Sequence, residues 1–498
     1  MTTAAHPLAD RLREAMARHR NRPAIGDGRR TLSYGELLDE VDAARTALVL
    51  APYEPVGLHV AQDLSTRILY LAVLLGGGVV VPLSHTWPVD RQHYVLDSLN
   101  ITRLLAAGQP ARCPAGWSPV RRVQEHQEFR ALGAAGEAKA LHSPVAGDPM
   151  AYVLHTSGST GTPKGVPVRQ SAVLTFLDYV VARYGIDPTA RLSATFELSF
   201  DLAVFDLLAP LLAGASVHLP IGREYLVPGE YATRAGLTHW FSVPSVISTA
   251  VAMDALAPGS LPSLRWSLFC GEPLMLSQAA QWREAAPGSV LENLYGPTEL
   301  TLACTQYRLP DDPRRWPTTV NGSVPIGSIY PHLDFRVGSA RDDAELLVDG
   351  PQRFDGYVDP THDDTAFETD CDGRRWYRTG DRVDVQAGQL VHRGRLDRQT
   401  KVGGMRIELD EVEGAFRKAP GVTGAAAVVI GEPGLRSIVV ALTGDADRAD
   451  EVTRRVADLL PEYMRPEDVR WLPAFPLNGN RKVDHLALAR LLDLDRAS

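Results

Sequence analysis

The run TSGSTGTPKGV, residues 156–166, combines glycines, hydroxyl side chains and one lysine in a pattern suited to polyphosphate. Gly158 and Gly161 leave room for backbone amides to approach an anion, because neither residue has a Cβ atom. Thr156 opens the run, and further donors follow it at Ser157, Ser159, Thr160 and Lys164. Such a loop predicts an enzyme that binds ATP.

The kinase-type P-loop is the obvious alternative, since it also wraps phosphates with glycines and a lysine. That motif needs glycine directly before the lysine and Ser or Thr directly after it. Here Pro163 precedes Lys164 and Gly165 follows it, which disfavours a Walker-type NTPase. A solvated turn is the second alternative, and the length of the match outweighs it. The flanks predict a buried strand at residues 151–155, then the loop, then a helix at residues 171–183.

The composition describes a soluble globular chain that is too long for one ordinary core. It has 498 residues, of which 45% are hydrophobic and 22% charged, so we expect at least two domains. A formal charge of −9 gives no electrostatic reason to expect nucleic acid or acidic membranes as partners. The N-terminus lacks an apolar signal core, and glycines at 76–78 interrupt the longest apolar stretch, residues 68–83. We expect a cytoplasmic protein.

Cysteine and lysine usage narrows the chemistry further. The four cysteines have no paired spacing, which favours neither a zinc site nor a disulfide framework. Only five of the 51 basic residues are lysine. A lysine in so arginine-rich a chain is a good candidate for a site that needs a compact ammonium. Three of the five, Lys164, Lys401 and Lys482, fall in motifs described here.

The elements that must position these residues fall into two groups. Over the first 390 residues, helical periodicity alternates with short β-rich runs, which predicts a layered α/β domain with largely buried strands. After residues 394–411 the pattern changes to that of an α+β unit of about a hundred residues, an ordinary small domain. Its expected helices begin near 411 and cover 450–460, and its expected strands lie at 425–430, 437–442 and 469–473. We therefore place the domains at residues 1–396 and 397–498.

Eight short motifs then coincide with one family. In chain order they are LSYGEL at Leu32, the loop at Thr156, SFDLAVFD at Ser199, NLYGPTE at Asn293, ELLVDGP at Glu345, YRTGD at Tyr377, GRLDRQTKVGG at Gly394 and NGNRKVD at Asn478. Each is weak alone, but together and in this order they are specific. Over nearly its whole length the sequence resembles the adenylate-forming superfamily of acyl-CoA synthetases, luciferases and nonribosomal peptide adenylation domains. The resemblance implies a large layered N-terminal domain and a small mobile α+β C-terminal domain.

The resemblance also implies an ATP site. Attack of a carboxylate on the α-phosphorus of ATP expels pyrophosphate, and fixed donors, Mg²⁺ and a lysine stabilise the developing charge. The loop at Thr156 would hold the outer phosphates, with Thr160 and Glu299 among the catalytic residues and Glu299 on the metal. Tyr295 would stack on adenine and Asn293 would bind its amino edge. The other implied ATP contacts are Gly271, Glu272, Pro273, Gly296, Thr298, Asp381, on the ribose hydroxyls, and Arg395.

Two positions in the C-terminal part have implied roles of their own. Lys482 would be the catalytic lysine that bridges the substrate carboxylate and the α-phosphate, although Arg481 stands where the family usually has glycine. Asp397 matches a hinge about which the small domain rotates between adenylate formation and thioester formation. Gly403 replaces an arginine common at its position, so contacts to pantetheine there are expected to differ. The alternative for Lys482 is a solvated basic turn. The alternative for Asp397 is an ordinary acidic residue of an interdomain linker.

The substrate class depends on Asp201, which matches the acid that binds the α-ammonium group in amino acid adenylation domains. The alternative is a helix N-cap, since Asp201 directly precedes LAVFDLLAPLL. By the same resemblance an uncharged side-chain pocket is formed by Leu202, Phe205, Ser242, Leu268, Cys270, Leu294, Leu302 and Ala303. Alanine is the first choice, and glycine, serine and proline stay open, because one methylene discriminates by only about 1–3 kcal/mol.

The expected activity is therefore ATP-dependent formation of a small aminoacyl-AMP, followed by transfer to the phosphopantetheine thiol of a separate carrier protein. The segment LFCGE at Leu268 especially resembles alanine–carrier protein ligases, including D-alanine enzymes of cell-wall polymers. No serine motif for phosphopantetheine attachment precedes Ser498, so the carrier is expected in trans, in natural-product biosynthesis. The alternatives are an acyl-CoA synthetase for a carboxylate without an amine, and a D-alanine ligase of cell-wall synthesis.

Overall fold

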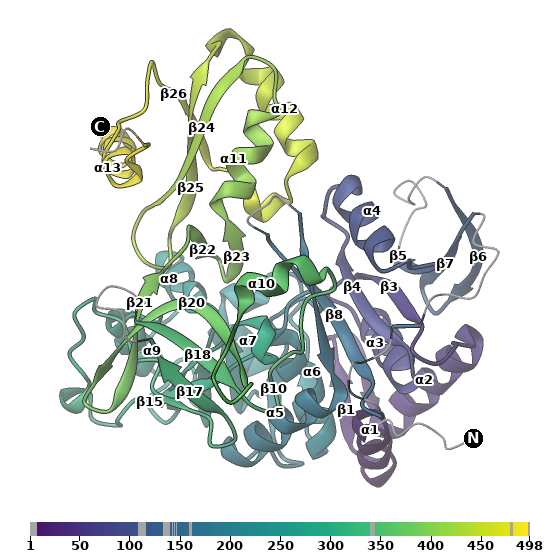
Figure 1. The fold of residues 1–498 in the computed structure, drawn as a ribbon. Helices are drawn as coiled ribbons and strands as arrows, with labels where there is room; N and C mark the ends of the chain where they lie inside the picture. Colours follow the sequence, from purple (N-terminus) through teal and green to yellow (C-terminus); the bar gives the residue numbers. More distant parts are fainter. Residues whose placement is uncertain are drawn as a thin grey trace.

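The protein is a mixed α/β chain with a large N-terminal domain and a smaller C-terminal domain, shown in a computed structural model (Figure 1). The structure describes residues 7–107, 116–132, 140–141, 143, 145, 147–158, 162–338, 344–478 and 482–496. This architecture confirms the fold class that the sequence predicts.

Two large sheets form the body of the N-terminal domain. The first is seven-stranded and runs in the order β6 (Trp117–Val123), β7 (His126–Ala131), β5 (Arg103–Ala107), β3 (Pro55–Val60), β4 (Val79–Ser84), β8 (Met150–Thr156), β9 (Lys164–Arg169). The second is nine-stranded: β16 (Ser328–Ile329), β15 (Thr305–Arg308), β14 (Val290–Tyr295), β13 (Trp266–Phe269), β12 (His239–Ser242), β10 (Arg191–Ser193), β11 (Ser216–His218), β1 (Pro23–Gly26), β2 (Thr31–Ser33). Their central strands are parallel and buried, as βαβ crossovers require.

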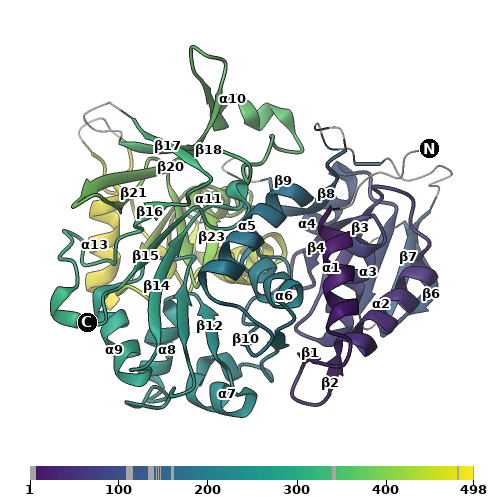
Figure 2. The same ribbon diagram turned by 90° about the horizontal axis from the view of Figure 1, so that it is seen from below.

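Helices fill the space between and around the sheets (Figure 2). α5 (Gln170–Arg183) contacts β8 and β9 of the first sheet, while α6 (Leu202–Ala213) contacts β10 and β11 of the second. One apolar core therefore joins both sheets. The other helices of this domain are α1 (Pro7–Arg18), α2 (Tyr34–Leu48), α3 (Leu64–Leu75), α4 (Val89–Ser98), α7 (Pro228–Ala235), α8 (Ser245–Ala252), α9 (Leu276–Ala285) and α10 (Asp363–Ala366).

The longest apolar stretch of the sequence forms a buried helix and strand. Every residue of α3 is buried, and Gly77 adopts a φ of 80° in the turn that leads into β4. Within the described part of the chain, no helix combines the length and apolarity that crossing a bilayer demands.

A third sheet leads toward the C-terminal domain. It contains β17 (Asp334–Val337), β18 (Glu345–Asp349), β19 (Phe367–Thr369), β20 (Arg375–Gln386) and β21 (Gln389–Arg395). A two-stranded hairpin follows, formed by β22 (Gln399–Val402) and β23 (Met405–Glu408). In Figure 1 this hairpin lies between the C-terminal domain and the large domain.

The C-terminal domain packs two helices on a three-stranded sheet with its own apolar core. Its elements agree with those that periodicity predicts. They are the helices α11 (Leu409–Arg417) and α12 (Ala449–Leu459) and the strands β24 (Val422–Ile430), β25 (Ser437–Gly444) and β26 (Asp468–Trp471). A last helix, α13 (His485–Arg496), packs on β24. The boundary at 396/397 stays a prediction.

One local prediction was wrong. The loop after β8 does not lead directly into a helix, because Lys164–Arg169 forms β9, which pairs antiparallel with β8 before α5 begins. Gly165 and Pro167 are buried along with Val166 and Val168, so the strand has no alternation of buried and exposed residues, and Pro167 lowers its strand propensity further. The phosphate loop therefore connects two antiparallel strands.

Candidate active site

A cavity of about 270 Å³ brings distant motifs together at the junction of the two domains. The loop after β8, the end of β14, the β20–β21 pair and the hairpin β22–β23 all contribute side chains to it. The sequence-predicted residues that line it are Thr156, Ser157, Asp201, Leu202, Gly271, Glu272, Pro273, Asn293, Leu294, Tyr295, Gly296, Thr298, Asp381 and Arg395.

Other predicted residues lie elsewhere. Those that do not line this cavity are Gly158, Lys164, Phe205, Ser242, Leu268, Cys270, Glu299, Leu302, Ala303, Asp397 and Lys482. Ser159, Thr160 and Gly161 lie outside the described residues. Of the eleven residues that do not line the cavity, eight are buried, Lys164 is half-buried, and Asp397 and Lys482 are exposed.

Asn293 ends a buried strand with one half of its amide free for a ligand. Its Nδ2 donates to the carbonyls of Val324 at 3.3 Å and Pro325 at 2.9 Å. Its Oδ1 is buried and has no partner among the described residues. A buried acceptor of this kind is costly unless a donor meets it, so the site is suited to an amino group.

Asp381 is the centre of a charged cluster beside Asn293. It accepts hydrogen bonds from Tyr295 Oη at 2.6 Å and His392 Nε2 at 3.0 Å, and Arg395 Nη1 lies 3.0 Å from its Oδ2. Burial alone would raise the pKa of Asp381, but the Arg395 charge and these hydrogen bonds hold it well below its usual range. The carboxylate is therefore an anion at neutral pH.

Glu299 is fully buried and paired with a residue of the C-terminal part. Arg406 Nη1 lies 3.0 Å from both of its carboxylate oxygens, and Tyr357 Oη donates to Oε1 at 2.7 Å. Burial opposes ionisation, yet Arg406 and then Tyr357 lower the pKa of Glu299 below its usual value. In this arrangement the cation next to Glu299 comes from the hairpin.

Lys164 lies near β23, the hairpin strand that carries Arg406. Its Nζ lies 5.6 Å from the centre of the Tyr357 ring. Burial raises the pKa of Glu408, and the charges of Arg406 and, more weakly, Lys164 oppose that rise. Gln399 donates to Glu408 Oε1 at 2.5 Å across the hairpin. Residues 406 and 408 share one face of β23, as alternate residues of a strand do.

Asp201 is held by a side chain from another motif. Thr298 Oγ1 donates to its Oδ2 at 2.7 Å. Asp201 occupies the N-cap position of α6 but makes no side-chain capping hydrogen bond there, so the N-cap alternative accounts for its position and not for its carboxylate. Burial raises the pKa of Asp201, while the Thr298 hydrogen bond and the Lys401 charge lower it. A buried carboxylate with so few partners is suited to a cationic ligand.

The wall behind Asp201 is closely packed and apolar. Phe205 and Phe241 meet edge to face with ring centres 4.9 Å apart. A Cβ atom at Gly296 would lie 2.5 Å from the Cα of Ala303, so only glycine fits there. Burial raises the pKa of Cys270 to about 12, which keeps its thiol neutral. The residues that surround Asp201 on this side are therefore apolar or neutral.

The hairpin is docked through Glu272. Gly404 N donates to Glu272 Oε1 at 2.8 Å, and Ser245 N donates to Oε2 at 3.0 Å. A Cβ at Gly404, whose φ is 79°, would lie 2.3 Å from Val243 Cγ1. Glycine thus permits the close approach of the two domains.

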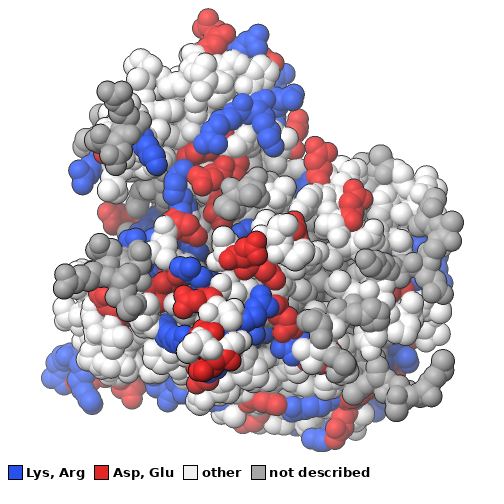
Figure 3. All heavy atoms as spheres, in the orientation of Figure 1, with Lys and Arg blue, Asp and Glu red and all other residues white. Residues whose placement is uncertain are grey.

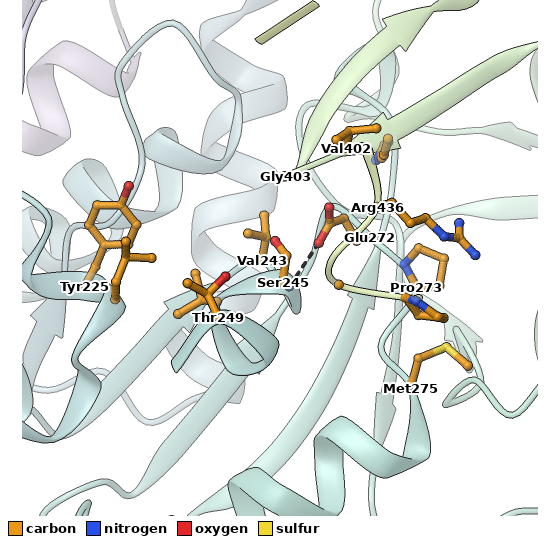
Figure 4. A pocket seen from close by; sticks show the side chains of 15 residues that line it. Tyr225, Val243, Ser245, Thr249, Glu272, Pro273, Met275, Val402, Gly403 and Arg436 are labelled. Atoms are coloured by element: carbon orange, nitrogen blue, oxygen red, sulfur yellow. Dashed lines mark hydrogen bonds between the residues drawn. The ribbon is translucent and has the colours of Figure 1, made fainter. Parts of the chain in front are cut away.

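A second cavity, of about 310 Å³, lies on the outer side of this contact (Figure 4). Tyr225, Thr249 and Met275 from the large domain face Gly403 and Arg436 from the small one. Four residues line both cavities: Glu272, Pro273, Lys401 and Arg436. A Cβ at Gly403 would meet nothing within 4 Å, so its small size leaves this cavity open.

Lys482 is exposed and lines neither cavity. Asn478 Oδ1 accepts from Lys482 N at 3.0 Å, and Leu477 bridges Val483. The structure therefore brings together the hairpin, the phosphate loop and Asp201, but not Lys482.

The comparison with known families agrees with this geometry. The AMP-binding enzyme family model matches residues 12–358, most of the large domain. The chain belongs to the AMP-binding enzyme family. It is an ATP-dependent ligase of the adenylate-forming superfamily.

Three proteins show what this chain is similar to in sequence or in structure. An L-proline–[L-prolyl-carrier protein] ligase of Streptomyces coelicolor is 33% identical, over 98% of this chain and 97% of that protein. The phenyloxazoline synthase MbtB of a Mycobacterium species is 32% identical over 92% of this chain, which spans 40% of the length of MbtB. The Vibrio cholerae adenylation domain AlmE, solved with glycyl-adenosine-5'-phosphate, is 26% identical with a TM-score of 0.84, over 99% and 98% of the two chains.

Sequence reasoning missed several residues of the site. Arg406 pairs with Glu299, and Arg91 forms a buried pair at 2.5 Å with Glu411 across the domain junction. Trp87 and Tyr463, which line the first cavity, lie beside that pair. The alternation MRIE at residues 405–408 was the available signal, because Ile407 enters the small core and Arg406 must then face the other way.

Proposed function

We propose that the chain activates a small uncharged amino acid as its aminoacyl-AMP and transfers it to the phosphopantetheine thiol of a carrier protein. The observation that carries this proposal is Asp201, a buried carboxylate that lines the first cavity. Its hydrogen-bond partner Thr298 is neutral and the Lys401 charge does not outweigh burial, so an α-ammonium group would supply a close compensating charge.

The first cavity fits ATP on the chemistry of its donors and acceptors. The unpartnered Oδ1 of Asn293 would accept from the adenine amino group, the Tyr295 ring would stack on the base, and Asp381 would accept from the ribose hydroxyls. The loop that begins at Thr156 and Ser157 would hold the outer phosphates.

Glu299 fits a role on Mg²⁺ only in part. Among the described residues, no group of three or more His, Cys, Asp or Glu side chains could hold a metal ion. Mg²⁺ usually takes one or two carboxylates and fills its shell with phosphate oxygens and water, so one glutamate is enough. When bound, the ion would neutralise charge on the phosphates. In this arrangement Arg406 holds both oxygens of Glu299.

The packing around Gly296 and Phe205 favours a small side chain, with alanine first. The names of the relatives refer to proline and to a glycyl adenylate, so glycine, proline and serine belong in the same test.

The second cavity supports transfer to a carrier. It is an opening between the domains that meets the first cavity at Lys401 and Glu272, as a channel for a long thiol arm requires. The exposed guanidinium of Arg436 lies on its wall and would suit the phosphate of a phosphopantetheine arm. Lys and Arg side chains also gather over α12 in Figure 3, a face suited to an acidic carrier.

Amino-acid-dependent exchange of pyrophosphate into ATP tests the proposal. The panel contains all proteinogenic amino acids, D-alanine, β-amino acids, and fatty and aryl acids. We expect a response to alanine or another small amino acid, and its loss in Asp201→Ala. A response to fatty or aryl acids alone, with CoA as acceptor, would establish an acyl-CoA synthetase instead.

A further inference from the structure

Glu299 is a buried carboxylate whose two oxygens are both held by one guanidinium. It is fully buried, and both oxygens receive the guanidinium of Arg406 at 3.0 Å. A buried carboxylate needs a compensating charge in every state of the protein. In the proposed adenylation state that charge is the Mg²⁺ of the nucleotide, so the inference rests on the proposed function of Glu299.

The two cations exclude one another. Mg²⁺ binds carboxylate oxygens at about 2.0–2.1 Å, closer than the guanidinium nitrogen of Arg406 lies now. An ion at that distance from either oxygen would stand within a few ångströms of Nη1, and Tyr357 Oη already takes one face of Oε1. Two like charges at such separation in a buried site repel strongly.

Arg406 also contacts the loop that would hold the phosphates. Its backbone carbonyl accepts from Ser157 Oγ at 2.9 Å. Two residues along the same strand face, Glu408 lies within the electrostatic reach of Lys164. The strand β23 thus presents a cation to the metal ligand and an anion toward the phosphate lysine, in the positions where a metal–pyrophosphate pair would supply the same charges.

We propose that Arg406 is a mobile counter-ion that takes the place of Mg²⁺ on Glu299 when the hairpin enters the site. When bound, Mg²⁺ would supply the charge that compensates Glu299, and in the docked arrangement the guanidinium of Arg406 supplies it instead. Arg406 is a positioning residue in this scheme, because its pairing with Glu299 would favour the docked hairpin when no metal is held there.

The direct test measures Mn²⁺, as a paramagnetic substitute for Mg²⁺, binding to the enzyme saturated with α,β-methylene-ATP. Competition with Arg406 lowers the apparent metal affinity by the fraction of molecules whose hairpin is withdrawn. We therefore expect Arg406→Ala to bind Mn²⁺ about three- to tenfold more tightly than the unaltered enzyme. Arg406→Lys, which keeps the charge but loses the fork, should lie between them.

A matched control is Arg393→Ala, which removes a guanidinium from the neighbouring strand β21 that pairs with Asp384 and lines neither cavity. It should leave Mn²⁺ affinity unchanged. In a Glu299→Gln background the additional Arg406→Ala change should have no effect on Mn²⁺ binding, since the shared anion is gone. A structural role alone would not produce this dependence on Glu299.

Unchanged or weaker Mn²⁺ binding by Arg406→Ala would overturn the proposal, provided that Arg406→Ala still binds the nucleotide and unfolds at the temperature of the unaltered enzyme. If it does not, Arg406→Lys carries the same test. Because these titrations use neither an amino acid nor a carrier, their failure is distinguishable from a failure of amino-acid-dependent exchange.

Discussion

Two segments of the small domain lie in different environments. One is the hairpin β22–β23, and the other contains Asn478 and Lys482. The hairpin places Lys401 and Arg406 in the first cavity and docks on Glu272. The turn holds Lys482 in an exposed position, closed by Leu477 and Val483. The small domain therefore presents two different surfaces, of which only the hairpin lies at the first cavity in this arrangement.

We infer a rotation of the small domain about Asp397 that exchanges the two surfaces. Asp397 pairs with Arg395 at 2.7 Å and accepts from Gln399 N at 3.1 Å, and it lies between the last strand of the third sheet and the hairpin. Gly403 and Gly404, both with positive φ, then allow the tight turn that enters the site.

The largest effect should come from Lys482→Ala. If the turn supplies the catalytic ammonium in the other arrangement, its removal costs about 3–4 kcal/mol in the adenylation barrier, a loss of two to three orders of magnitude. Transfer from supplied aminoacyl-AMP should stay near its original rate. Pyrophosphate exchange and single-turnover transfer measure the two steps, and normal exchange would refute the role of Lys482.

Arg91→Met should come next, because it leaves Glu411 buried and unpaired only while the hairpin is docked. Breaking one partner of a buried ion pair costs about 3 kcal/mol or more, and the pair joins the domains at 2.5 Å. We expect slow transfer with intact exchange. The double variant Arg91→Met/Glu411→Met should recover transfer. Equal loss of both steps in the single variant would show that the pair does not act in the docked arrangement alone.

Asp397→Pro should have a smaller and selective effect. Proline restricts φ at the proposed hinge and disfavours free rotation, so we expect thioester formation to fall by about tenfold, near 1.4 kcal/mol. Exchange should change less. An equal loss in both assays would indicate that residue 397 is an ordinary linker.

The smallest effect is a shift of pH dependence at the amino acid site, which both arrangements share. Burial raises the pKa of Asp201 above that of an ordinary aspartate. As pH falls through that raised pKa, the carboxylate gains a proton and loses its attraction for the α-ammonium group. The KM for the amino acid should therefore rise at a higher pH than for an exposed aspartate, and Asp201→Asn should show no such limb.

Most of the cavity could be predicted from the sequence because its residues lie in contiguous motifs. Asn293 and Tyr295 end one strand, and Asp381 and Arg395 pair across another two, so local structure already places them near one another. The strands and helices of the small domain followed from clear periodicity.

The contacts that could not be predicted from the sequence depend on how the two domains meet. The contact of Arg406 with Glu299 joins residues 107 positions apart, and that of Arg91 with Glu411 joins residues 320 apart. No local periodicity encodes such pairs, since each joins residues of different domains. The position of Lys482 relative to the first cavity likewise depends on how the two domains meet. The strand β9 was missed for a different reason, because Pro167 lowers its strand propensity.

A distance measurement tests most directly whether the small domain rotates and exchanges its two surfaces. Val251 on α8 and Leu486 on α13 are exposed and suit spin labels, after Cys113 and Cys371 are changed to serine. We predict that Mg²⁺, α,β-methylene-ATP and the preferred amino acid together shift the electron–electron distance distribution to a second, separate population. A single distribution that stays the same with and without these ligands would contradict the account.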